Sequence, residues 1–91
     1  MGDLNYDLIK ATEKGDLNKV ELLLQKGADV NYIFKYGQKS SLMIASEGGY
    51  LDTVKLLLEN GADVNLINNY GQTALYLHQK KIVWIYYKNY Y

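Results

Sequence analysis

Apolar residues recur at helical spacing in two stretches of the chain. In the later stretch, Val54, Leu57 and Leu58 fall at positions i, i+3 and i+4, which places them on one face of a helix. Leu51 and Leu56 widen this apolar stripe. The earlier stretch has the same pattern in Leu17, Val20, Leu22, Leu23 and Leu24. The pattern predicts two equivalent helices, each with a broad buried side.

A shorter helix is predicted before each of these two. Residues 40–47, SSLMIASE, begin with a hydroxyl side chain suited to an N-cap and carry Leu42 and Ala45 at helical spacing. Gly48 and Gly49 then end the helix and start a turn. The same plan recurs towards both ends of the chain, in Leu8, Ile9, Ala11, Thr12 and Gly15 and in Thr73, Ala74, Leu75 and Leu77.

The long helices belong to a sequence repeat. ATEKGDLNKVELLLQKGADVN at 11–31 and ASEGGYLDTVKLLLENGADVN at 45–65 align without a gap and are identical at 13 positions. In each copy a glycine, Gly27 or Gly61, follows the helix where a left-handed C-terminal cap favours this residue. The tripeptide YGQ follows both copies at the same interval, so the unit extends beyond GADVN. Units of this length bury their apolar faces by stacking on one another.

These residues resemble the ankyrin repeat, a turn-helix-turn-helix unit of about 33 residues. The resemblance covers roughly residues 4–79 and includes both GADVN segments and both YGQ segments. It implies an all-α fold, an ankyrin-repeat solenoid of stacked helix-turn-helix units joined by β-turn or hairpin fingers. We expect one domain over 1–91, with an N-terminal capping repeat at 1–31, a full repeat at 32–65 and a truncated repeat at 66–91.

Three departures from the repeat change the expected structure. Gly37 to Leu42 spans one residue more than Gly71 to Leu75, so the loop near Lys39 is expected to bulge. The usual Thr-Pro-Leu-His is altered in both places, which weakens or replaces the hydrogen bonds that the histidine would make. The last unit lacks its turn glycine and its GADVN ending, so the chain stops inside its third unit.

The last segment, KKIVWIYYKNYY at 80–91, is apolar and aromatic, and three interpretations of it stay open. Its apolar residues could pack on the helix containing Val54 as an irregular cap, with wet tyrosine hydroxyls. It could instead be a docking surface for a partner or a second copy, with Trp84, Tyr86 and Tyr87 as the alternative interface. The third interpretation is contact with a membrane surface. The residue types suit a strand as well as a helix.

Composition narrows the classes of function. The 91 residues contain 10 basic and 10 acidic side chains, which argues against a protein that grips a phosphate backbone, so no nucleic-acid partner is expected. Without cysteine there is no disulfide framework and no thiolate metal site. The longest apolar run has six residues where a spanning helix needs about 20, so we expect no transmembrane segment. The absence of cysteine and of a secretory pattern at the N-terminus points to a cytoplasmic protein.

Side chains that could do chemistry are few. His78 is the sole histidine and is interpreted as a helix residue that faces the neighbouring turn. Asp29 and Asp63 are expected to accept hydrogen bonds from nearby backbone N–H groups and to hold the GADVN turns. Glutamates such as Glu47 and Glu59 show no paired spacing. We therefore expect no enzyme, no metal and no cofactor.

A binding surface is the remaining function. The resemblance implies that finger tips and first helices form a concave face that binds a partner protein. Tyr32, Phe34 and Tyr36 alternate along the first tip, so an extended finger turns their rings to one side. The expected partner-binding residues are Tyr32, Phe34, Lys35, Tyr36, Gln38, Lys39, Asn69, Tyr70 and Gln72. Alternatively, Ile33 and Phe34 fill space between fingers, and the two YGQ tyrosines are ordinary repeat residues. The alternative function is a fragment or short paralogue that self-associates, or stacks on a larger array, through the aromatic tail.

Overall fold

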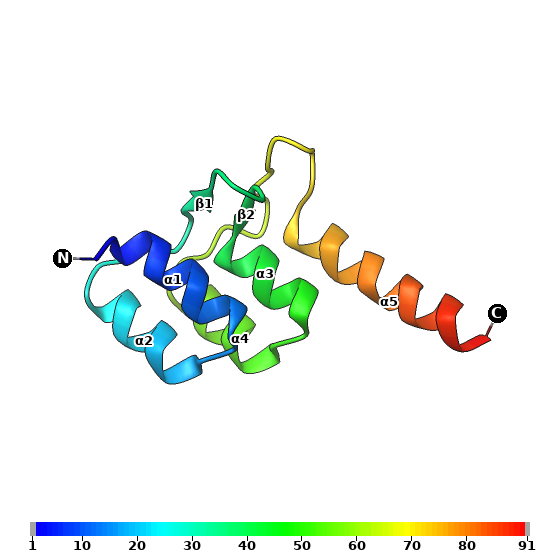
Figure 1. Cartoon of the computed structure of the whole chain (residues 1–91), viewed down its shortest axis with the longest axis horizontal. Helices are drawn as coiled ribbons and strands as arrows, with labels where there is room; N and C mark the ends of the chain where they lie inside the picture. The colour runs from blue at the N-terminus through cyan, green and yellow to red at the C-terminus, as the bar shows by residue number, and fades with distance from the viewer. Residues whose placement is uncertain (1, 91) are drawn as a thin grey trace.

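The computed structural model describes the backbone of residues 2–90 and the side chains of residues 2–81 and 88. These residues form helices and one small hairpin, and Figure 1 shows their order. The elements are α1 Leu4–Glu13, α2 Leu17–Gln25, β1 Ile33–Phe34, β2 Lys39–Ser40, α3 Ser41–Gly48, α4 Leu51–Glu59 and α5 Ala74–Tyr90. The expected mostly helical fold with helix pairs and fingers is confirmed.

The helices lie in two layers. α1, α3 and α5 pack side by side in one layer, and α2 and α4 pack side by side in the other. Within each pair, α1 contacts α2 and α3 contacts α4. The layers enclose a core of apolar side chains that includes Leu8, Val20, Leu23, Leu42, Met43 and Leu57. Because each pair covers its neighbour, the core runs along the stack.

The helix ends fall where the cap residues predict them. The Ser40 Oγ accepts a hydrogen bond from the Met43 N–H at 3.3 Å and so caps α3. Gly27 and Gly61 follow α2 and α4 with φ angles of 101° and 87°, which a side chain would disfavour. The predicted N-cap of α3 and the predicted glycine caps are confirmed.

The broad apolar stripe predicted for α2 and α4 is wrong at three leucines. Leu57 is fully buried, but its neighbour Leu58 is 43% exposed, and Leu51 is 72% exposed. In α2, Leu23 is buried and Leu22 is exposed. The buried face is narrower than predicted because, among the described residues, other helices pack against only one part of the surface of each of these helices. Thr53, four residues before Leu57, is buried on that face instead.

The last helix differs from its predecessors by having no turn. α5 runs without interruption from Ala74 to Tyr90, which agrees with the missing turn glycine at Ile82. The backbone is helical where an irregular cap or a strand was considered, and the helix packs against α3. The side chains of Trp84, Tyr86 and Tyr87 lie outside the described residues, so the alternative interface stays a prediction.

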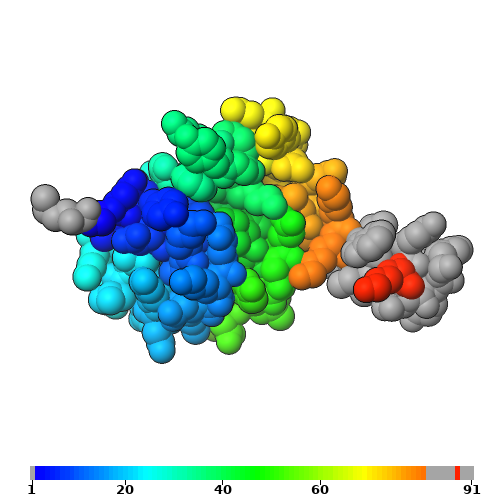
Figure 2. All heavy atoms as spheres, viewed as in Figure 1, coloured from blue at the N-terminus to red at the C-terminus, as the bar shows by residue number. Residues whose placement is uncertain are grey.

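Two loops project from the same edge of the stack, and we call them the first finger (residues 32–39) and the second finger (residues 66–72) (Figure 2). The first finger is a hairpin in which Ile33 pairs with Ser40 and Phe34 with Lys39. Gln38, next to the extra residue, has a φ of 55°, which is unusual for a residue other than glycine. The bulge expected near Lys39 stays a prediction.

Candidate functional site

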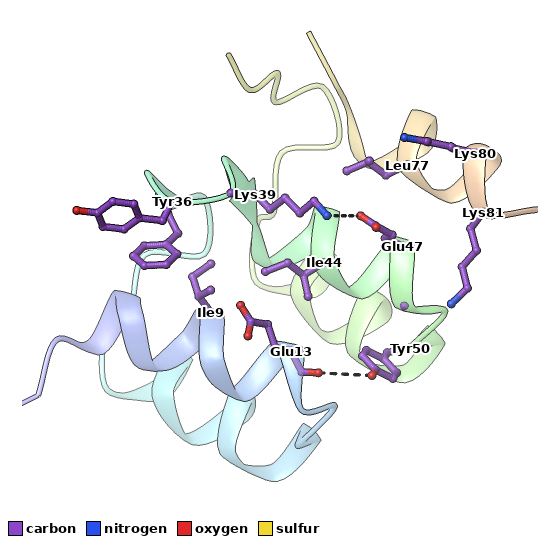
Figure 3. A pocket seen from close by; sticks show the side chains of 13 residues that line it. Ile9, Glu13, Tyr36, Lys39, Ile44, Glu47, Tyr50, Leu77, Lys80 and Lys81 are labelled. Atoms are coloured by element: carbon purple, nitrogen blue, oxygen red, sulfur yellow. Dashed lines mark hydrogen bonds and ion pairs between the residues drawn. The ribbon is translucent and has the colours of Figure 1, made fainter. Parts of the chain in front are cut away.

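A groove of about 690 Å³ lies between the first finger and the layer of α1, α3 and α5. Its floor is apolar and takes one side chain from each of three helices, Ile9 of α1, Ile44 of α3 and Leu77 of α5 (Figure 3). Ile9 and Leu77 are almost completely buried, while Ile44 is half-buried. The stacking of successive helices therefore creates an apolar surface that no single helix could supply.

Aromatic rings from the first finger form one rim of the groove. Phe34 is half-buried and packs edge-on against Tyr6 of α1, with ring centroids 5.3 Å apart. It makes a second edge-on contact with Tyr36 at 5.5 Å. Tyr36 is 69% exposed, and the Lys35 Nζ lies 5.0 Å from the centroid of its ring. These contacts hold Phe34 in place and leave Tyr36 presented to solvent.

An ion pair crosses the groove from the finger to α3. The Lys39 Nζ lies 2.7 Å from the Glu47 Oε2, and both side chains are partly exposed (Figure 3). That carboxylate oxygen has almost no solvent-accessible surface of its own. The pair links β2 to α3 and neutralises both charges, although a partly exposed pair adds little stability.

Tyr50 closes the end of the groove below α3. Its ring lies against Gly48, where an added Cβ would come within 2.8 Å of a ring carbon. The Tyr50 hydroxyl donates a long hydrogen bond, 3.5 Å, to the Glu13 carbonyl of α1. Glycine at 48 therefore lets the ring connect the ends of two neighbouring helix pairs.

A family model described as ankyrin repeats (3 copies) matches residues 8–80. The chain belongs to the ankyrin-repeat family. The match covers α2, α3 and α4 completely. It also covers α1 from residue 8 onwards and α5 up to residue 80. No curated protein sequence matches the chain at a significant level.

The ankyrin groove contains only part of the predicted partner-binding set. Phe34, Tyr36 and Lys39 line it, and Lys35 contacts Tyr36. Tyr32, Gln38, Asn69, Tyr70 and Gln72 do not appear among the described residues of its wall. Tyr70 is 70% exposed, about as much as its repeat counterpart Tyr36, but it lies on the second finger. The two equivalent tyrosines thus have different surroundings.

Two glutamines of the predicted set make hydrogen bonds in the fingers, and Gln38 joins one finger to the other. The Gln38 Nε2 donates to the Lys35 carbonyl at 3.2 Å, and its Oε1 accepts from the Asn69 N–H at 3.2 Å. The Gln72 Oε1 accepts from the Asn68 Nδ2 at 2.9 Å. Their side chains are therefore engaged within the protein.

Asn68 is the residue that the sequence analysis missed. It is buried, and its Nδ2 also donates to the Gln38 carbonyl at 2.7 Å, which joins the second finger to the first. Its Oδ1 accepts from the N–H groups of Tyr70 and Gln72 at 2.9 and 3.0 Å. The only available signal was an asparagine ahead of a YGQ turn, a residue that favours turns.

The predicted roles of the turn aspartates are confirmed. The Asp29 Oδ1 accepts from the Asn31 N–H, and the Asp63 Oδ1 accepts from the Asn65 N–H, each at 2.9 Å. His78 was expected to face a turn, but its Nδ1 lies 3.1 Å from the Ser46 carbonyl of α3. Because a carbonyl can only accept, this nitrogen carries the hydrogen. His78 therefore ties α5 to α3.

Within the described residues, no three side chains of the usual metal-binding types come together. None of the described helices has the length and apolarity needed to cross a bilayer.

Proposed function

We propose that the chain is a non-catalytic module that binds a segment of a partner protein in the groove between the first finger and helices α1, α3 and α5. The observation that carries this proposal is the apolar floor of Ile9, Ile44 and Leu77 beside the exposed ring of Tyr36. A groove of about 690 Å³ can hold a few side chains of a bound segment. Ankyrin repeats generally act as protein-binding modules, which supports the same conclusion.

The groove's polar groups also favour binding over chemistry. Glu47 is engaged by Lys39, and His78 is not among the described wall residues. A general acid or base needs a positioned partner and a titratable group within reach of a substrate. We further propose that 1–91 is one domain divided into units at 1–31, 32–65 and 66–91, supported by the core that runs along the stack.

The two equivalent tyrosines allow a matched test of the groove. Proteins captured from a lysate by the native chain are compared with those captured by Tyr36→Ala and by Tyr70→Ala, with circular dichroism to check folding. Because both rings are equally exposed, both changes remove similar surface. We expect Tyr36→Ala to lose the partner and Tyr70→Ala to retain it. Retention by both variants, or loss by Tyr70→Ala alone, would overturn the groove as the site.

A second candidate function is association through the C-terminal end of the stack. Leu51, Leu58 and Leu75 are 72%, 43% and 62% exposed there. Their repeat counterparts Leu17, Leu24 and Leu42 are half-buried or buried because the next helix pair covers them. Among the described elements, no helix lies on the far side of α4.

Sedimentation velocity tests this second candidate. If the end self-associates, the native chain forms dimers or larger species at micromolar concentration, and Leu58→Asp shifts it to monomer. A native chain that is monomeric at these concentrations and is unchanged by Trp84→Ser would count against the candidate.

A further inference from the structure

Some charged side chains around the groove are paired with an opposite charge, and others are not. Lys39 and Glu47 neutralise one another at 2.7 Å, and the Glu13 Oε2 lies 3.5 Å from the Lys10 Nζ. On the α5 side, Lys80 and Lys81 line the groove, and neither has a carboxylate within 4.0 Å among the described side chains. The α5 wall is therefore cationic without a neutralising partner.

These two lysines stand beside the apolar floor. Lys80 and Lys81 follow Leu77 by three and four residues, so all three side chains lie on one face of α5. Figure 3 shows both lysines extending from α5, Lys80 on the side of Leu77 and Lys81 towards the end of the groove where Tyr50 lies. Both lysines are exposed, so they can reach a ligand without first giving up an internal contact. A ligand that places an apolar side chain on the groove floor can therefore bring its flanking residues to one or both of these amines.

The opposite wall holds carboxylates that are already paired with lysines. Glu13 and Glu47 are its carboxylates, and both are on the α1 and α3 side. An anion on that side would meet ion pairs with no charge to spare, whereas one on the α5 side would meet two lysines that have no carboxylate partner among the described side chains. The apolar floor between the walls does not suit a phosphate backbone, which needs several cations in a row. The occupant with the best complementarity is therefore a peptide segment with an apolar residue and carboxylates on one flank.

We propose that the partner segment is acidic, with a Leu, Ile or Phe type of anchor on the groove floor and Asp or Glu side chains that contact Lys80 and Lys81. This inference rests on the proposed function of the groove and adds the chemistry of its partner. Because both amines are exposed, the attraction is screened by salt over about 8 Å at physiological ionic strength. Binding therefore weakens as salt rises.

A selection from a library of random peptides tests this chemistry without a known partner. The probes are displayed peptides of about a dozen residues, long enough to carry an anchor and its flanks. They are selected on the full chain and measured against three variants. Lys80→Glu with Lys81→Glu reverses the charge of the α5 wall. Lys19→Glu with Lys55→Glu makes the same change in net charge on exposed positions of α2 and α4, away from the groove. Tyr36→Ala reports whether a peptide uses the groove at all.

We expect the selected peptides to place Asp or Glu within a helical turn of an apolar residue. Their affinity falls about tenfold with Lys80→Glu and Lys81→Glu, and less than about twofold with the Lys19 and Lys55 pair. A neutral or basic consensus that still depends on Tyr36 would overturn the acidic partner and leave the groove's function standing. Equal losses in both charge-reversed pairs would also overturn it, because net charge and not the α5 wall would then govern binding. If no selected peptide depends on Tyr36, both proposals fail.

Discussion

At the scale of single residues, asparagines couple the successive turns of the stack. The Asn5 Oδ1 accepts from the Asp29 N–H, and the Asn31 Oδ1 accepts from the Asp63 N–H, each at 2.7 Å. The sequence predicted the local turn bonds of the two aspartates because donor and acceptor are two residues apart. It could not predict the asparagine bonds because their partners are far away in the chain and meet only after the repeats stack.

Asn31 and its repeat counterpart Asn65 give a matched test of this coupling. Asn31→Ala removes the bond to Asp63 and a second one from its Nδ2 to the Gly61 carbonyl at 3.3 Å. We expect the free energy of unfolding to fall by about 1–2 kcal/mol in urea titrations. Among the described residues the Asn65 side chain has no such bond, so Asn65→Ala should change the free energy of unfolding by less than about 0.5 kcal/mol. Equal effects at the two positions would contradict the assignment.

The neighbouring pair Asn68 and Asn69 tests the connection between the fingers. Asn68→Ala leaves the Gln38 carbonyl and two backbone N–H groups without their partner in a part-buried place. We expect a loss of about 2–3 kcal/mol in the free energy of unfolding. Asn69 is exposed and contributes only its backbone, so Asn69→Ala should lose less than about 0.5 kcal/mol. A thermal melt that ranks the two variants in the reverse order would refute this role of Asn68.

At the scale of helices, sequence periodicity located the elements better than it located their buried faces. The caps at Ser40, Gly27 and Gly61 were predictable because each depends on local backbone geometry. Three consecutive leucines, however, cannot all face the core of a helix, and a run of leucines does not say which does. The neighbouring helices decide this, since they cover Leu57 and leave Leu58 exposed.

We therefore predict losses of different size when Leu57 and Leu58 are each replaced by alanine. Leu57→Ala truncates a fully buried side chain and leaves a cavity in its place, so it should lower the free energy of unfolding by about 3 kcal/mol. Leu58→Ala removes a side chain that is 43% exposed, so the loss should stay below about 1 kcal/mol. Chemical denaturation of both variants compares them directly. A larger loss for Leu58→Ala would contradict this assignment of the buried face and support the broader apolar face that the sequence predicted.

At the scale of the whole molecule, the candidate site depends on the stack. The aromatic residues of the first finger were predicted as binding residues because exposed rings near a turn are typical of interfaces. The second finger was predicted by equivalence, but only the first finger lines the groove among the described residues. Lys80 and Lys81 were assigned to the tail because the sequence offered no turn after Leu77. Their place in the groove follows from the packing of α5 against α3.

The measurement that tests the groove most directly is chemical-shift mapping of a bound ligand by nuclear magnetic resonance. The isotope-labelled full chain is titrated with the tightest peptide from the library selection. The account predicts that the largest changes fall on amides of the groove, around Tyr36, Ile44, Glu47 and Leu77. Amides of α2 and the far side of α4 should barely change. Changes concentrated around Leu51 and Leu58, with the groove undisturbed, would contradict the account and place binding at the open end of the stack.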